Sequence, residues 1–296
     1  MIQKVNSFAK INLFLYVTSK REDGYHNLCS LMTQIDLCDE IDLDFSKKKI
    51  TVTCNHPHVP ENKSNIAYKA ASLFFDSLKA GDNKNQKRLA IKIKKKIPVG
   101  GGLGGGSSNA AAVLTALNQY YNTPFTKSQL IKMGLSLGAD VPFFIFNTPA
   151  IARGVGEKLE KIEGLKPYYM VLCDPGIQAS TAKVYKNIDF KLTTKQKYNI
   201  NTGLSVLLRG MDFDVRDIMH NDLEESACSL YPEIMKTREE MELLLERAVF
   251  MTGSGSSLFA LFASQENADK GYKKLLEKWN KSKKKVFLSS FKRNMH

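Results

Sequence analysis

The sequence predicts an α+β protein with two domains, and three observations carry this prediction. The chain has 296 residues, which is longer than one typical domain. Strand-like and helix-like patterns are segregated along it, as in α+β folds. A buried strand pattern at residues 168–173 (YYMVLC) follows a polar, proline-containing turn at 164–167. We therefore expect a first domain over residues 1–165 and a second over 166–296.

The elements of the first domain are predicted from the period of the apolar residues and from capping residues. They are a strand at 2–17, a hairpin pair at 36–43 and 50–53, an amphipathic helix at 65–78, a strand at 89–99, a helix at 110–121, a helix from Thr126 to Gly138 and a strand pair at 150–159. The second domain is predicted by the same signals. Its elements are a strand at 168–173, helices at 202–208, 222–227 and 232–247, a strand at 258–262 and a helix at 267–278.

The most informative segment is residues 98–112 (PVGGGLGGGSSNAAA), which has six glycines within seven residues. Each glycine forfeits side-chain burial, but it leaves bare backbone N–H groups that can wrap a compact anion. The loop joins a strand that alternates apolar and basic residues to a helix for which Ser107 or Ser108 is the expected N-cap. Flanking elements this regular argue against a flexible linker, so the segment predicts a phosphate-binding loop.

Three common phosphate-binding motifs are excluded. A P-loop needs lysine directly before its Ser/Thr, and Gly106 stands there. Gly100, Gly102 and Gly105 satisfy G-x-G-x-x-G, but the dinucleotide fold also needs an acid about 20 residues on, and residues 118–133 contain none. The chain has neither the His-Arg-Asp nor the Asp-Phe-Gly sequence of protein kinases.

The glycine segment resembles the second motif of the GHMP kinases, small-molecule kinases that include galactose, homoserine and mevalonate kinases. Residues 7–15 (SFAKINLFL) and 251–259 (MTGSGSSLF) resemble the family's motifs at the two ends of the chain. The resemblance implies a ribosomal-protein-S5-like first domain and a ferredoxin-like second domain, with the active site in the cleft. It also implies that ATP contacts the glycine loop, namely Pro98, Val99, Gly100, Gly101, Gly102, Leu103, Gly104, Gly105, Gly106, Ser107 and Ser108.

Further markers are similar to one branch of this family: residues 9–12 (AKIN), 23–26 (DGYH) and 138–144 (GADVPFF). That branch phosphorylates a hydroxyl of a cytidine-diphosphate-linked methylerythritol in the non-mevalonate route to isoprenoids. Mevalonate and homoserine kinases are the alternative, and they would not need the turn at 23–26.

The resemblance implies that Asp140 and Lys10 act on the acceptor hydroxyl. Asp140 follows the expected helix end at Gly138, and Pro142 is expected to hold Val141 extended, which places the carboxylate on a sharp turn. Lys10 and Asn12 share one face of the expected strand, while apolar residues share the other, and the resemblance implies that Asn12 contacts the acceptor. From the pattern alone such a lysine is usually solvent-facing. Whether Asp140 removes the proton or only orients the hydroxyl is left open.

The resemblance also implies the acceptor site. Tyr25 would stack on cytosine, His26 would meet the polar edge of the base, and Tyr185 would close an aromatic sandwich. Gly253 and Ser254 belong to a loop whose amides are expected near the phosphates. Mg²⁺ is expected to be held chiefly by ATP oxygens and water, with a hydroxyl of Ser107 or Ser108, or the Asp140 carboxylate, nearby. The sequence does not fix which of these residues is a metal ligand.

The charge composition of the chain indicates which kinds of ligand it binds. The formal net charge is +13, with lysine runs at 47–49, 94–96 and 281–285. Nucleic-acid binding is the main non-enzyme alternative, but the runs are scattered and no aromatic residues interleave them. We expect solvated lysine faces and a positive field for two polyphosphate ligands, without nucleic acid or membrane, in a monomer or homodimer.

The cysteine pattern gives information about metal binding and about the cellular compartment of the protein. Five cysteines without C-x-x-C pairing indicate reduced thiols, and no apolar stretch suggests a signal peptide or a membrane span. We therefore expect a cytoplasmic protein. Cys54, His56 and His58 lie on a proline-containing stretch and lack a fourth ligand, which argues against zinc.

Overall fold

The computed structural model describes residues 2–78, 88–188 and 214–292. Two compact units interleave along the chain. The first takes residues 1–9, 37–99 and 104–147, and the second takes 10–36, 100–103 and 148–296. The neighbouring strands β1 (Ile2–Lys20) and β2 (His26–Asp44) both run from one unit into the other. The division expected between residues 165 and 166 stays a prediction.

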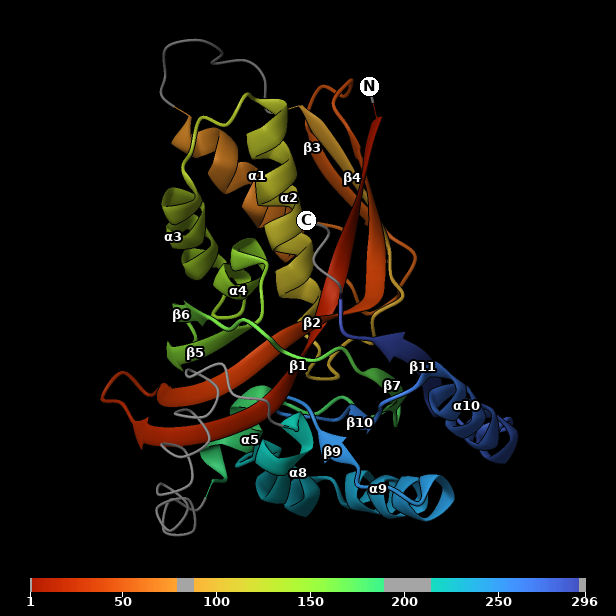
Figure 1. The fold of residues 1–296 in the computed structure, drawn as a ribbon. Helices are drawn as coiled ribbons and strands as arrows, with labels where there is room; N and C mark the ends of the chain where they lie inside the picture. The colour runs from red at the N-terminus through yellow and green to blue at the C-terminus, as the bar shows by residue number, and fades with distance from the viewer. Residues whose placement is uncertain (1, 79–87, 189–213, 293–296) are drawn as a thin grey trace. The chain divides into compact units, whose positions relative to one another are not determined.

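The first unit packs helices against a sheet (Figure 1). Its further elements are β3 (Ile50–Cys54), α1 (Ile66–Ser77), β4 (Leu89–Lys94), α2 (Gly105–Tyr120), α3 (Lys127–Leu137) and α4 (Val141–Phe146). The predicted helix at 65–78 is confirmed: the Asn65 side chain accepts from the Ala67 amide at its start, and Ala70, Ala71 and Phe74 are buried. Thr126 forms the expected N-cap, here a capping box with Gln129, and α3 ends at Gly138.

The hairpin expected between residues 36–43 and 50–53 is wrong. The strand β4 lies between the two, paired antiparallel with β2 and parallel with β3. Cross-strand charge explains this order, because Glu40 lies opposite Lys94 and Asp42 lies opposite Lys92. Opposite charges placed directly across an antiparallel pair stabilise it, which favours the basic strand beside the acidic one.

The second unit holds a ferredoxin-like sheet. Its strands follow the chain in the order β7 (Tyr169–Asp174), β9 (Phe250–Met251), β10 (Leu258–Phe262) and β11 (Lys285–Ser290), and the sheet order is β11-β7-β10-β9, all antiparallel. Helices lie between the first and second strands and between the third and fourth, which gives the β-α-β-β-α-β arrangement. The expected α+β class is confirmed.

Helices lie against this sheet (Figure 1). The apolar core of the unit includes Val171, Met241, Phe262 and Trp279. The remaining elements of the unit are β5 (Ala150–Gly154), β6 (Lys158–Lys161), α5 (Thr181–Lys186), the 3₁₀ helix Val215–Ile218, β8 (His220–Asn221), α8 (Glu224–Leu230), α9 (Pro232–Leu245) and α10 (Gln265–Trp279). The strand pair predicted at 150–159 is confirmed as β5 and β6. The helix expected at 202–208 lies outside the described residues.

Candidate active site

The glycine loop has a backbone that only glycine adopts easily. Gly100, Gly102 and Gly104 have φ of +77°, +76° and +69°, in the left-handed region that costs other residues energy. Gly104 is the N-cap of α2, which begins at Gly105. The expected N-cap at Ser107 or Ser108 is therefore wrong, because a left-handed glycine lets the helix begin earlier than the first hydroxyl residue.

Both sides of the glycine loop are tied to one buried carboxylate in the first unit. Asp39 accepts hydrogen bonds from the Lys96 and Ile97 amides, at 2.8 and 2.9 Å, just before the loop. Its other oxygen accepts from Asn109 of α2 at 2.9 Å and from the Lys95 ammonium at 2.5 Å. The side chains of Asp39 and Lys95 are 0% and 4% exposed. This carboxylate therefore fixes the strand that enters the loop relative to the helix that leaves it.

The buried Lys95 corrects the expectation that the lysine runs form solvated faces. Lys94, the last residue of β4, and Lys96 are exposed and contact Glu40, whereas the Lys95 ammonium between them contacts Asp39. In extended backbone, neighbouring side chains point to opposite faces. A run of three lysines in the sequence does not show that the middle one is buried.

The two serines of the loop differ in environment. Ser108 is buried, and its hydroxyl accepts from Ser7 at 2.7 Å, while Ser7 in turn accepts from Asn109. Ser107 is half-buried, and a Cβ built on Gly138 would lie 3.8 Å from its hydroxyl oxygen. Ser107 thus lies beside the turn that carries Asp140, whereas Ser108 is committed to the interior.

Asp140 is half-buried at the start of a short helix. It has helical backbone angles (φ −83°, ψ −15°) as the N-cap residue of α4, and Val141 and Pro142 form the first turn. The expectation that Pro142 holds Val141 extended is wrong. Proline is favoured in the first turn of a helix, where its missing N–H costs nothing, and burial of Val141 and Phe143 draws this segment into the helix.

Lys10 and Asn12 lie on one strand face, as expected, and both are buried in the second unit, at 4% and 5% exposure. The Lys10 ammonium donates to the Asn12 side-chain oxygen at 2.7 Å, and the Asn12 amide group donates to the Ser30 hydroxyl at 2.7 Å. The Asn12 backbone N–H donates to the Thr252 hydroxyl at 3.0 Å. The solvent-facing alternative for Lys10 is excluded.

The second and third sequence motifs meet within this unit. The Leu103 carbonyl accepts from the Lys10 amide at 3.0 Å, and the Gly101 carbonyl accepts from the Ser257 amide at 3.2 Å. A Cβ on Gly102 would lie 2.3 Å from the Thr252 carbonyl, and one on Gly253 would lie 3.3 Å from the Lys10 ammonium. Residues 100–103 and 252–257 therefore require glycine where they touch, and Lys10 lies at their junction.

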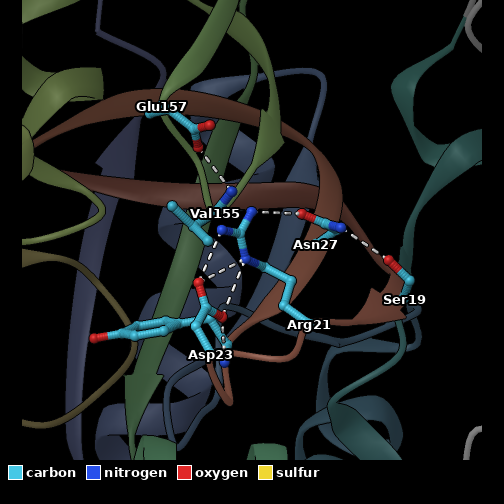
Figure 2. A network of polar contacts seen from close by, with 7 residues as sticks. Ser19, Arg21, Asp23, Asn27, Val155 and Glu157 are labelled. Carbon is cyan, nitrogen blue, oxygen red and sulfur yellow. Dashed lines mark hydrogen bonds and ion pairs between the residues drawn. The ribbon is translucent and has the colours of Figure 1, made fainter.

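The turn between β1 and β2 presents Tyr25, which is 64% exposed. Figure 2 shows the side chains that hold this turn. The Arg21 guanidinium donates to both Asp23 oxygens and to Asn27, and Asn27 donates to Ser19. Asp23 also accepts from the Tyr25 amide at 3.1 Å. The turn is thus shaped by an exposed ion pair and side chain–backbone bonds.

His26 stacks on Tyr185, with ring centroids 5.2 Å apart and planes inclined by 27°. Burial lowers the pKa of His26 below its ordinary value, and the charge of Lys20 adds to this effect. The imidazole is then neutral at pH 7, with one donor and one acceptor nitrogen. The structure brings His26 and Tyr185 together; Asp140 and Lys10 belong to different units, and their partnership stays a prediction.

Within the described residues, no group of three or more His, Cys, Asp or Glu side chains could hold a metal ion. All five cysteines are free thiols. In the same part of the chain, no helix is both long enough and apolar enough to cross a membrane.

Sequence reasoning missed Asp39, Lys95 and Asn109. The available signal was charge complementarity, because an acidic strand at 36–44 faces a basic segment at 92–96. That pattern predicts pairing of the strands, but which acid turns inward depends on the register.

Comparison with known proteins gives the family. The description "GHMP kinases N terminal domain" matches residues 65–148, and "GHMP kinases C terminal" matches 213–281. A relative from Citrifermentans bemidjiense is 41% identical over 261 residues, covering 88% of this chain and 89% of its own. A relative from Alkaliphilus metalliredigens is 39% identical over 274 residues, covering 92% of each. Both are named 4-diphosphocytidyl-2-C-methyl-D-erythritol kinase. The chain belongs to the GHMP kinase family.

Solved structures agree with this assignment. A crystal structure titled 4-(cytidine 5'-diphospho)-2C-methyl-D-erythritol kinase superposes with a TM-score of 0.78 at 32% identity, covering 99% of this chain and 100% of its own. A homoserine kinase from Cytophaga hutchinsonii superposes with a TM-score of 0.72 at 18% identity, covering 98% and 94%. The second similarity shows the fold alone.

Proposed function

We propose that this enzyme transfers the γ-phosphate of ATP to the 2-hydroxyl of 4-diphosphocytidyl-2-C-methyl-D-erythritol. The products are the 2-phosphate and ADP, in the non-mevalonate route to isoprenoid precursors. The observation that carries the proposal is 41% identity to a curated kinase of that name over 88% of this chain. The chain is a phosphotransferase of the GHMP kinase family, and ATP is its co-substrate.

The glycine loop is proposed to hold the ATP phosphates. Residues 98–108 combine left-handed glycines with the first turn of α2, whose unpaired N–H groups and dipole favour an anion. The Asp39 contacts on both sides of the loop support this role, because a loop with preset N–H directions loses less entropy when it binds.

Asp140 and Lys10 are proposed to act on the acceptor hydroxyl. Asp140 orients the hydroxyl or accepts its proton, and Lys10 stabilises negative charge on the transferring phosphoryl group. A loose transition state needs positioning and charge stabilisation more than base strength. The anchoring of the Lys10 ammonium by Asn12 supports a fixed direction for this charge.

Mg²⁺ is proposed to be held mainly by ATP oxygens and water, with one protein hydroxyl. It would neutralise charge on the transferring phosphate. The residues present fit this role: Ser107 is half-buried beside Gly138, while the Ser108 hydroxyl is already used by Ser7. We therefore assign the hydroxyl to Ser107.

The acceptor is proposed to lie against Tyr25, His26 and Tyr185 through cytosine, and against Gly253 and Ser254 through its diphosphate. The contact between His26 and Tyr185, and the neutral state of His26, support an aromatic surface with hydrogen-bonding capacity. A cytoplasmic location, a monomer or homodimer, and a domain division at 165/166 stay predictions.

The proposal is tested with the cytidylyl substrate, mevalonate and homoserine as acceptors, with ADP formation measured for each. Only the first should be turned over at an appreciable rate. Asp140→Asn should retain ATP binding and lower turnover about 10²–10⁴-fold if proton transfer matters. Asp217→Asn, a change at an exposed aspartate of the 3₁₀ helix, is the control. Wild-type turnover in Asp140→Asn would remove this residue from the chemistry.

A further inference from the structure

The Asn221 side chain makes three hydrogen bonds, two of them to the family motif at residues 251–259. Its side-chain amide donates to the Met251 carbonyl and to the Gly253 carbonyl, both at 2.9 Å. Its side-chain oxygen accepts from the Leu223 amide at 3.0 Å, one residue before α8. One side chain therefore ties the loop at 252–257 to the start of a helix.

The residues on either side of Asn221 fix it to the strand that carries Lys10. β8 pairs parallel with β1, with His220 opposite Phe14 and Asn221 opposite Leu15. The Asp222 amide donates to the Leu15 carbonyl at 2.9 Å, and the Asp222 carboxylate accepts from the Val17 amide at 2.7 Å. Asn221 thus lies in a segment that is hydrogen-bonded to β1, and its side chain joins that segment to the loop.

The bond to Gly253 also sets the direction of a donor. In a trans peptide the N–H points away from the preceding C=O. With the Gly253 carbonyl held by Asn221, the Ser254 N–H must point to the opposite side. Gly253 has φ of +58°, a conformation that glycine leaves easily because its backbone is permissive. The Ser254 N–H therefore keeps its direction only if another group prevents rotation of the peptide between Gly253 and Ser254.

We propose that Asn221 is a positioning residue for phosphoryl transfer: it locks the 252–257 loop beside Lys10 so that the loop's amides bind the diphosphate of the acceptor. The inference rests on the proposed function. Asn221 itself touches neither substrate nor the reacting atoms, and acts through Gly253 and Ser254. A loop held in place before binding loses less entropy when the acceptor arrives.

The test compares Asn221→Asp with Asn118→Asp. Both changes keep the shape of the side chain and replace a donor that meets a carbonyl, because Asn118 donates to the Phe125 carbonyl at 3.0 Å at the end of α2. In Asn221→Asp a carboxylate oxygen would face two carbonyl oxygens and repel them. We expect kcat/KM for the cytidylyl substrate to fall about 10–100-fold in Asn221→Asp, the size of a small misplacement of bound groups. The KM for ATP should stay near the wild-type value.

Asn118→Asp should lower the melting temperature while leaving kcat/KM near wild type at temperatures where it is folded. Equal acceptor kinetics in the two variants would overturn the proposal. If Asn221→Asp does not fold, Asn221→Ser is judged by the same criterion, because serine is too short to reach both carbonyls and adds no charge.

A second measurement does not depend on activity. Amide hydrogen exchange over residues 251–257 should become faster in the Asn221 variant than in Asn118→Asp, and unchanged exchange there would contradict the role. If the wild-type protein did not phosphorylate the cytidylyl substrate, the proposed function would fail, while the exchange experiment would still show whether Asn221 holds the loop.

Discussion

The strand entering the glycine loop and the turn that presents Tyr25 are both held by carboxylates, but in opposite environments. Asp39 is completely buried with Lys95 and accepts four hydrogen bonds. Asp23 and Arg21 are 49% and 40% exposed. Removing one partner of a buried charge pair strongly lowers the stability of a protein, whereas an exposed pair contributes little to stability. The strand that enters the glycine loop is therefore held rigidly, whereas the turn that presents Tyr25 is free to adapt.

The largest effect is expected from Asp39→Asn. It leaves the Lys95 ammonium buried without a counter-charge and turns an amide donor toward other donors. Loss of one partner of a buried pair costs about 3–5 kcal/mol, so the melting temperature should fall strongly and ATP affinity should fall in the fraction that remains folded. Calorimetry and ATP titration measure both.

The control for this change is Glu40→Gln, which alters the neighbouring carboxylate of the same strand. Glu40 contacts Lys94 and Lys96 but is 41% exposed, so the change should barely affect stability. If Asp39→Asn were as mild as Glu40→Gln, the contrast between the two regions would not hold.

The second effect concerns the backbone of the glycine loop. Gly104→Val places a β-branched residue at φ of +69°, which costs on the order of 1–3 kcal/mol in strain, and ATP affinity should fall far more than stability. Gly164→Val has the same kind of strain at φ of +74° with open space around it. Equal ATP affinity in the two variants would show that the loop does not contact the nucleotide.

The third effect tests the exposed turn. Tyr25→Ala should raise KM for the cytidylyl substrate roughly 5–150-fold, by analogy with base–aromatic stacking worth about 1–3 kcal/mol, and leave ATP affinity nearly unchanged. Tyr25→Phe keeps the ring face and should be mild. If both variants resembled wild type, Tyr25 would be only the tip of a hairpin.

The smallest effect is expected from Arg21→Ala. Its exposed ion pair shapes the turn without being buried (Figure 2), so KM for the cytidylyl substrate should rise only a few-fold and stability should hardly change. Arg216→Ala removes a similar exposed pair with Asp214 elsewhere in the second unit and should leave kinetics unchanged. A large loss in Arg21→Ala would mean that the guanidinium itself binds the acceptor.

Much of this arrangement could be predicted from the sequence. Asn65 and Thr126 identified two helix starts, and apolar periodicity identified strands and helices of both units. The glycine pattern predicted a loop between a strand and a helix, and the structure has this loop between β4 and α2. These features are local, because they depend on the conformational preferences of a residue and its near neighbours.

Pairing and burial were decided by the tertiary structure. The insertion of β4 between β2 and β3 and the helix after Asp140 both depend on packing against partners distant in the chain. The same holds for the inward direction of Asp39 and the three bonds of Asn221. A charged or amide side chain is found both in water and in an interior that supplies its hydrogen-bonding partners. The sequence position of such a residue therefore does not tell which of the two environments it occupies. Whether such a side chain is buried or exposed is decided by the tertiary packing, because that packing supplies or withholds its hydrogen-bonding partners.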